Sequence, residues 1–174
     1  MVAFDSYENI PRLASRYQAQ LDGTANESID ELTDDLYLCA AKREGVLPAL
    51  LDVLIAFLRD QRSVRLAGLE GIFSNFEIES DCFEDSDYQR FLPATFEIFP
   101  DLLPAAQFSL VHVWAKVATH ETVSGIASIG PKDPDARNLL AHALGHIVNE
   151  CTDVEVMSMA KRALDDIGGN PDHW

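Results

Sequence analysis

The sequence predicts an all-α protein, and three observations lead to this fold class. Apolar residues recur at helical spacing along most of the 174-residue chain, and no segment alternates cleanly enough to predict a half-buried strand. Asp, Ser and Pro residues stand where helices are expected to begin, and glycines where they are expected to end. Apolar residues make up 47% of the chain and charged residues 24%, which is typical of a folded domain. We therefore expect residues 1–174 to form a single helical domain.

The first 45 residues are predicted to form a pair of helices. Asp5 or Ser6 is placed to cap the first helix, which Gly23 is expected to end. Ser28 is placed to cap the second helix, and Gly45 to end it. Both helices carry apolar residues on one side, as expected for helices packed against a core.

Residues 46–75 are predicted to form a second pair. The segment Val46–Leu58 is apolar on almost every side, so we expect it to lie between neighbouring helices. A short polar turn from Arg59 to Ser63 then leads into a helix predicted over Val64–Asn75. Its small residues would allow another backbone to come close.

Residues 76–87 are predicted to form an acidic loop. The segment Glu77–Asp87 carries six carboxylates and no basic residue, together with the apolar side chains of Ile78 and Phe83. One interpretation is a solvated linker. The other is a docking loop for a Lys/Arg-rich surface, in which Phe83 is an apolar anchor. The predicted partner-binding residues of this loop are Glu77, Glu79, Asp81, Phe83, Glu84, Asp85 and Asp87.

Residues 88–130 are predicted to form the middle helices. One is expected to run to Phe99, where Pro100 and Pro104 interrupt the helical pattern. A second helix is predicted over Ala105–Thr119, with Phe108 among its apolar residues, and a short third helix over Thr122–Ile129.

Residues 131–174 are predicted to form a C-terminal helix pair. A turn containing Asp133 and Pro134 leads into a helix over Asp135–Glu150, and a second helix follows over Asp153–Ile167. Gly168-Gly169 is placed to stop this last helix. The tail Asn170–Trp174 is expected to fray unless Trp174 docks.

Two of these helix pairs have related patterns. Val64-Arg65 recurs as Ala136-Arg137, 72 residues later, and at the same offset Ile72 matches Leu144. The segment Val46–Asn75 combines an apolar first helix with an early proline, an Asp-containing turn and a second helix that opens on Val-Arg. It resembles a HEAT repeat, as does Pro134–Ile167, whereas the middle helices lack the Asp turn and the Val-Arg opening. The resemblance implies antiparallel helix pairs in a short right-handed α-solenoid that holds another macromolecule. The alternative is an irregular α-helical bundle.

One face of the predicted helix Asp135–Glu150 carries a run of polar residues. Asn138, His142, His146 and Glu150 follow one another at steps of four, so they share this face. A pair of His residues at this spacing can chelate a divalent metal, with Glu150 as a further ligand. However, Ala143 stands where the HExxH motif of metalloproteases requires its catalytic Glu. We therefore predict a partner-binding surface here, and neither a metal nor a cofactor site.

The charge and the remaining motifs limit the possible functions. Thirteen Lys and Arg against 29 Asp and Glu give a net charge of −16, which disfavours binding to nucleic acid or to an anionic membrane and favours a basic protein partner. Neither a nucleophile elbow nor a glycine-rich phosphate-binding loop occurs. Cys39, Cys82 and Cys151 form no CxxC pair, and no signal peptide or long apolar span is evident. We therefore expect a cytoplasmic protein.

These observations predict a non-enzymatic protein-binding module. The most specific form is an acidic inhibitor or immunity-type protein that neutralises a basic partner such as a toxin. A first alternative is a HEAT-type adaptor or scaffold subunit of a larger complex, which predicts an exposed apolar patch around Phe91, Phe96, Phe99 and Trp114. A second alternative is a metal-dependent enzyme that uses the His142/His146 helix face.

Overall fold

The computed structural model describes residues 10–29, 31–32, 47–78 and 84–172. Within these residues every regular element is a helix, so the predicted all-α class is confirmed. The α-helices are α1 (Ile10–Leu21), α3 (Leu47–Leu58), α4 (Leu69–Ile78), α5 (Asp85–Ile98), α6 (Pro104–Val117), α7 (His120–Ser128), α8 (Pro134–Glu150) and α9 (Val154–Ile167). Two 3-10 turns, η2 (Ser63–Arg65) and η4 (Phe99–Asp101), complete the described elements. None of the described helices is both long enough and apolar enough to cross a membrane.

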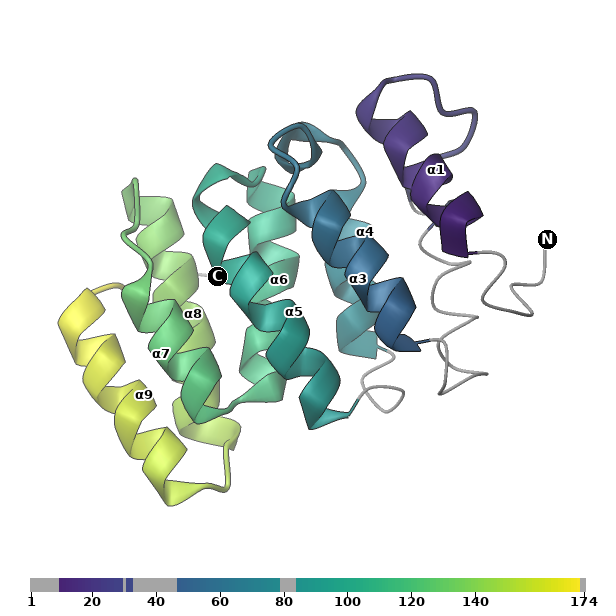
Figure 1. Ribbon diagram of the computed structural model, residues 1–174. Coiled ribbons are helices and arrows are strands. Elements are labelled where there is room, and N and C mark those ends of the chain that lie inside the picture. The colour runs from purple at the N-terminus through teal and green to yellow at the C-terminus, as the bar shows by residue number, and fades with distance from the viewer. Residues whose placement is uncertain (1–9, 30, 33–46, 79–83, 173–174) are drawn as a thin grey trace.

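The helices lie in two rows (Figure 1). One row contains α1, α3, α5, α7 and α9, each packed against the next, and the other contains α4, α6 and α8. From α3 onward, consecutive helices therefore alternate between the rows. The hydroxyls of Ser74 in α4 and Ser109 in α6 lie 3.2 Å apart, each at the sixth position of its helix. The C-terminal ends of α4, α6 and α8 lie along one edge of the molecule, where α5, α7 and α9 begin.

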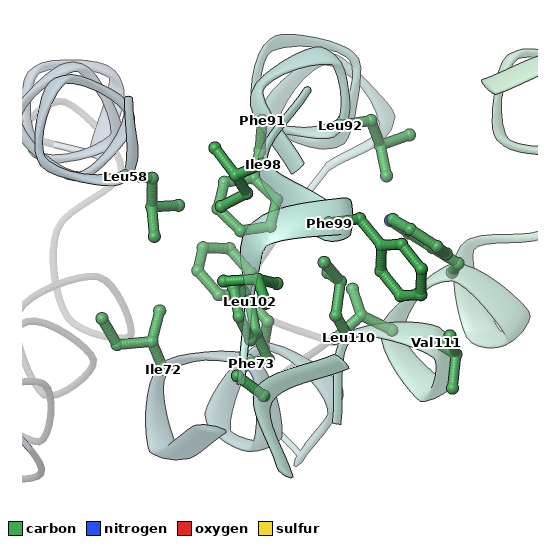
Figure 2. Packing of buried hydrophobic residues seen from close by; sticks show 14 of the residues in the cluster. Leu58, Ile72, Phe73, Phe91, Leu92, Ile98, Phe99, Leu102, Leu110 and Val111 are labelled. Atoms are coloured by element: carbon green, nitrogen blue, oxygen red, sulfur yellow. The ribbon is translucent and has the colours of Figure 1, made fainter. Parts of the chain in front are cut away.

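The core lies between the two rows, as Figure 2 shows. Leu58 of α3 and Phe91 of α5 point toward Phe73 of α4 and Leu110 of α6, and all four side chains are fully or almost fully buried. The Phe91 ring also stacks on Phe76, with ring centroids 4.2 Å apart. Burial of each such side chain contributes about 1.5–3 kcal/mol, so contact between the rows is a main source of stability.

Trp114 is the largest fully buried side chain of this core. Its indole N–H donates a hydrogen bond to the Thr95 hydroxyl at 3.0 Å, and this hydroxyl donates to the carbonyl of Leu92 at 2.7 Å. Both buried polar groups are therefore satisfied. Phe99 packs against the indole at a centroid distance of 5.0 Å.

This burial corrects the prediction of an apolar patch on the surface. Phe91, Phe99 and Trp114 are each 0% exposed, and Phe96 is partly buried against the Trp114 ring. These aromatic side chains belong to the core because α4, α6 and α7 cover them. They therefore do not offer an adaptor surface to a partner.

Several predicted helix ends are confirmed. The Ser28 hydroxyl accepts a hydrogen bond from the Glu31 backbone N–H, and the Glu31 carboxylate accepts one from the Ser28 N–H, which together form a capping box. Most of the helix predicted after Ser28 lies outside the described residues. Asp133 and Asp153 cap α8 and α9 through their carboxylates, and Gly168 ends α9 with a φ of +66°.

Two predicted boundaries are wrong. The helix predicted over Val64–Asn75 begins only at Leu69, because Gly68 takes a φ of +88° that an α-helix does not contain. The Ser63 hydroxyl donates to the carbonyls of Leu58 and Asp60 and so closes the end of α3. The predicted acidic loop is also shorter than expected, because α4 extends to Ile78 and α5 begins at Asp85.

Candidate interaction surface

The predicted acidic loop is divided between two helices and the connection that joins them. Glu77 lies in the last turn of α4, and Asp85 is the first residue of α5. Glu79, Asp81 and Phe83 lie outside the described residues. The proposed role of Phe83 as an apolar anchor therefore stays a prediction.

The last two loop positions help to begin α5. Glu84 is the exposed N-cap residue, and its backbone N–H donates to the Asp87 carboxylate at 2.9 Å. Asp87 is only 9% exposed. The carboxylate of Asp87 thus stabilises the first turn of α5, whereas Glu84 remains at the surface. The role of Asp87 in binding a partner stays a prediction.

The four predicted residues of α8 have distinct contacts. The side-chain oxygen of Asn138 accepts a hydrogen bond from the backbone N–H of Asn170 at 3.0 Å. The Nδ1 atom of His142 lies 3.1 Å from the carbonyl oxygen of Pro171, and Nδ1 of His146 lies 3.0 Å from the Glu150 carboxylate. Because carbonyl and carboxylate oxygens only accept hydrogen bonds, Nδ1 carries the proton in both imidazoles.

The contacts of Asn138 and His142 place Asn170 and Pro171 of the C-terminal tail against α8. Trp174 itself lies outside the described residues. A Cβ atom at Gly169 would lie 2.9 Å from the Arg137 carbonyl oxygen, so glycine allows the tail to approach this closely. Between the tail and α8 is an open pocket of about 430 Å³, whose lining includes His142, His146, Pro171 and Asp172.

Two residues that the sequence did not single out join this face. His112 of α6 has its ring centroid 5.5 Å from that of His142 and 6.1 Å from that of His146, whose own rings are 4.5 Å apart. Phe108 is 40% exposed and packs edge-on against His112, with ring centroids 4.7 Å apart. An alignment of α6 with α8 from their helix starts would have placed His112 beside His142, since each is the ninth residue of its helix.

A second feature is an acidic edge, defined as the exposed residues Glu84, Glu121, Glu150, Asp153 and Glu155. They lie at the connections α4–α5, α6–α7 and α8–α9, along the lower edge of Figure 1. The last two connections are adjacent, because the Cys151 sulfur lies 3.9 Å from the carbonyl oxygen of Ala118. The structure thus places Glu150, predicted as a site residue, in one row with carboxylates from other helix ends.

Some carboxylates of the acidic edge have local partners. Asp153 accepts hydrogen bonds from the backbone N–H groups of Val156 and Glu155, and these bonds lower the pKa of the Asp153 carboxyl below its usual 3.8. The Glu155 carboxylate lies 3.7 Å from the His120 imidazole. Glu150 stands at the C-terminal end of α8, where the helix dipole disfavours a negative charge, so its position does not arise from helix stabilisation.

Most ion pairs of Lys and Arg lie along the opposite edge. There Arg59 pairs with Glu97, Lys132 pairs with Asp101, and Arg62 pairs with both Asp22 and Asp60. The hydrogen bonds from Arg62 lower the pKa of Asp60 to about 2. None of these three Lys and Arg residues pairs with a carboxylate of the acidic edge.

In the described part of the chain, no group of three or more His, Cys, Asp or Glu side chains could hold a metal ion. No protein-family model, curated protein or solved structure matches this chain.

Proposed function

We propose that this chain is a non-enzymatic protein-binding module that neutralises a basic protein partner, as an inhibitor or an immunity-type protein does. The observation that carries the proposal is the acidic edge, in which exposed carboxylates from every second helix connection, α4–α5, α6–α7 and α8–α9, lie on one side of the molecule. A surface of this kind attracts Lys- and Arg-rich proteins and speeds their association. The net charge of −16 extends the same attraction to longer range.

The distribution of ion pairs supports this edge as the binding surface. Carboxylates such as Asp60 and Asp101 on the opposite edge already have cationic neighbours. The carboxylates of the acidic edge are exposed, and those with local partners face imidazoles, Glu150 beside His146 and Glu155 beside His120, or cap a helix, as Asp153 does. Burial of the aromatic residues Phe91, Phe99 and Trp114 removes the apolar patch that an adaptor subunit was expected to expose.

We further propose that the helices form HEAT-like pairs, α3 with α4, α5 with α6, and α7 with α8, because α8 packs in the same row as α4 and α6. This division differs from the pair expected over Pro134–Ile167, which joins α8 with α9. The first helices begin at Leu47, Asp85 and His120, at intervals of about 35–40 residues, similar to the ~40 of HEAT units. The alternation of helices between two rows is what stacked helix pairs require. In such a stack, each additional helix pair adds the connection to the next pair to the acidic edge.

The test is capture of partners from a lysate of the source organism, with elution by a salt gradient and identification by mass spectrometry. The wild type is compared with Glu121→Gln/Glu155→Gln, which neutralises two exposed carboxylates of the acidic edge. The matched control is Asp165→Asn/Asp166→Asn, which removes the same charge from the exposed end of α9. Glu79→Gln/Asp81→Asn extends the comparison to the predicted docking loop.

We expect a basic protein that elutes at moderate salt, is lost from the acidic-edge variant and is retained by the control. The activity of that protein must also fall when the wild-type chain is added. A partner that both variants retain, or that elutes only at high salt, would contradict the proposal, because exposed charges are screened at high ionic strength. A partner whose activity is unchanged would exclude the inhibitor role.

A further inference from the structure

The open pocket of about 430 Å³ between α8 and the C-terminal tail is the strongest feature that the proposed function does not use. We propose that this pocket binds one arginine side chain of the basic partner. A volume of this size is typical of pockets that enclose a small ligand. The inference rests on the proposed function and deepens it, because it names the group that the partner inserts beside the acidic edge.

Close packing of the tail on α8 forms the pocket. A Cβ atom at Gly145 would lie 2.9 Å from the Cβ atom of Pro171, so glycine allows the tail to lie this close to the helix. The carbonyl of Pro171 is held by Nδ1–H of His142. The backbone N–H of Asp172 donates to the side-chain oxygen of Asn170 at 3.0 Å. These contacts fix the position of the tail backbone that carries the Asp172 carboxylate.

Part of the pocket lining is apolar. It consists of the side chains of Val148 in α8, Leu164 in α9 and Pro171 in the tail. The methylene stem of an arginine packs on apolar surface of this kind, while its charged head remains near polar groups and water. The lining therefore suits a long side chain that is apolar along its stem and polar at its end.

The polar part of the lining offers hydrogen-bond acceptors. His142 and His146 carry their protons on Nδ1, which donates to Pro171 and Glu150 respectively. In a neutral imidazole of this tautomer, Nε2 is an acceptor. The exposed Asp172 carboxylate lines the same pocket. A guanidinium has several N–H donors and no acceptor, so it complements this lining, and neither imidazole loses its existing hydrogen bond.

The shape of the polar groups favours arginine over lysine. The rings of His142 and His146 have centroids 4.5 Å apart and are inclined at 72°. A planar guanidinium stacks on an aromatic ring and binds a carboxylate through two N–H groups at once, whereas an ammonium is a compact and strongly hydrated charge. Arginine can therefore use an imidazole face and the Asp172 carboxylate together.

The pocket borders the acidic edge. Glu150 belongs to that edge and accepts a hydrogen bond from His146, which lines the pocket. The charges of the edge attract a basic protein over a distance, because they are exposed and numerous. A few anchor residues carry most of the binding energy of an interface, and arginine is often one of them. The edge would thus guide the partner, and the pocket would hold it.

The test is an NMR titration of the full chain with Nα-acetyl-arginine N-methylamide in about 0.15 M NaCl, which screens loose binding to surface carboxylates. The controls are the lysine probe and the citrulline probe, in which a neutral urea of similar shape replaces the guanidinium. We expect saturable binding of the arginine probe at about millimolar concentration. The affinity for the lysine probe should be about fivefold lower or less, and the citrulline probe should not saturate.

The imidazole nitrogens report on the pocket directly. Proton–nitrogen correlation spectra should show Nδ1 protonated in His142 and His146, and their Nε2 signals should shift as the arginine probe is added. The signals of His120 in α7, which does not line the pocket, should stay unchanged.

Asp172→Asn removes the negative charge of the lining and keeps its shape. The affinity for the arginine probe should fall about fivefold or more, because a charge-assisted bidentate contact is lost. Asp166→Asn is the matched control, since it removes the same charge from an exposed position of α9, and it should bind as the wild type does. The comparison of arginine and citrulline probes uses the wild type alone and does not depend on the folding of a variant.

Three results would overturn the inference. The first is the absence of saturable binding of the arginine probe. The second is equal affinity for the arginine probe and either control probe. The third is equal affinity of the wild type and Asp172→Asn. None of them changes the outcome of the capture experiment, which depends on Glu121 and Glu155 outside the pocket. A chain that binds the arginine probe but captures no basic protein would contradict the proposed function instead.

Discussion

At the scale of single residues, Gly125 shows how closely the core of this protein is packed. A Cβ atom at this position of α7 would lie 2.1 Å from the Cε2 atom of Phe96. That ring in turn packs on the buried Trp114 at a centroid distance of 5.1 Å. The Phe96 ring can therefore occupy its position only because residue 125 has no side chain.

We predict that Gly125→Ala destabilises the protein. Inside a helix, alanine stabilises the folded state by about 1 kcal/mol relative to glycine. Overpacking of a core destabilises it by about 1–3 kcal/mol. Because the overlap with Phe96 is severe, we expect a destabilisation near the upper end of this range. The net loss should be about 1–2 kcal/mol in the free energy of unfolding, measured by urea denaturation.

The control for this substitution is Gly130→Ala, because a Cβ atom at Gly130 has no neighbour within 4 Å. Its free energy of unfolding should stay within about 0.5 kcal/mol of the wild type. Equal stability of Gly125→Ala and the wild type would show that Phe96 can move away at little cost.

At the scale of elements, α8 holds the C-terminal tail through side chains of its polar face. The bond between Asn138 and the backbone N–H of Asn170 begins this contact, and the bond between His142 and Pro171 continues it. The tail thereby covers part of α8 and orients the imidazole of His142.

We predict that Asn138→Ala loosens this tail. Loss of one hydrogen bond costs about 0.5–1.5 kcal/mol, and most of that cost should appear as local opening because the tail contributes little to the core. Amide hydrogen exchange of Gly169, Asn170 and Asp172 should become several-fold faster, while exchange in α6 stays unchanged. Asn149→Ala, an exposed substitution in the same helix, should leave the exchange of the tail as it is. Unchanged exchange in Asn138→Ala would show that this bond does not hold the tail.

At the scale of the whole molecule, the excess of carboxylates opposes folding. A net charge of −16 on a chain of 174 residues produces self-repulsion in the folded state. The ion pairs along one edge offset only part of this repulsion, since exposed pairs contribute little.

We therefore predict that salt stabilises the protein. Between 0.01 and 0.15 M NaCl the screening length falls from about 30 to about 8 Å. Tm should therefore rise by a few degrees, because a gain of 1 kcal/mol in the free energy of unfolding raises Tm by about 2–4 °C. Differential scanning calorimetry measures this change. The Glu121→Gln/Glu155→Gln variant should show a smaller rise. A Tm that falls with salt would mean that ion pairs such as Arg62–Asp60 outweigh the repulsion.

The repeat pattern illustrates how local and tertiary information differ. The match between Ile72 and Leu144 has an offset of 72 residues, whereas α4 and α8 begin at Leu69 and Pro134, 65 residues apart. The difference of seven residues is about two helical turns, so both alignments place apolar residues on the same face. Periodicity therefore indicated the correct faces but not the correct alignment of the helices.

The sequence by itself determined the helical class, the cap at Ser28, the turn at Asp133 that begins a helix, the charge, and the shared face from Asn138 to Glu150. All of these depend on residues within one or two helical turns, or on a sum over the chain. Tertiary structure alone decided that His112 joins the histidines of α8, that the tail docks beside them, and that carboxylates from three connections form one edge. The physical reason is that these contacts join residues about 30 or more positions apart, and only the packing of the two rows brings them together.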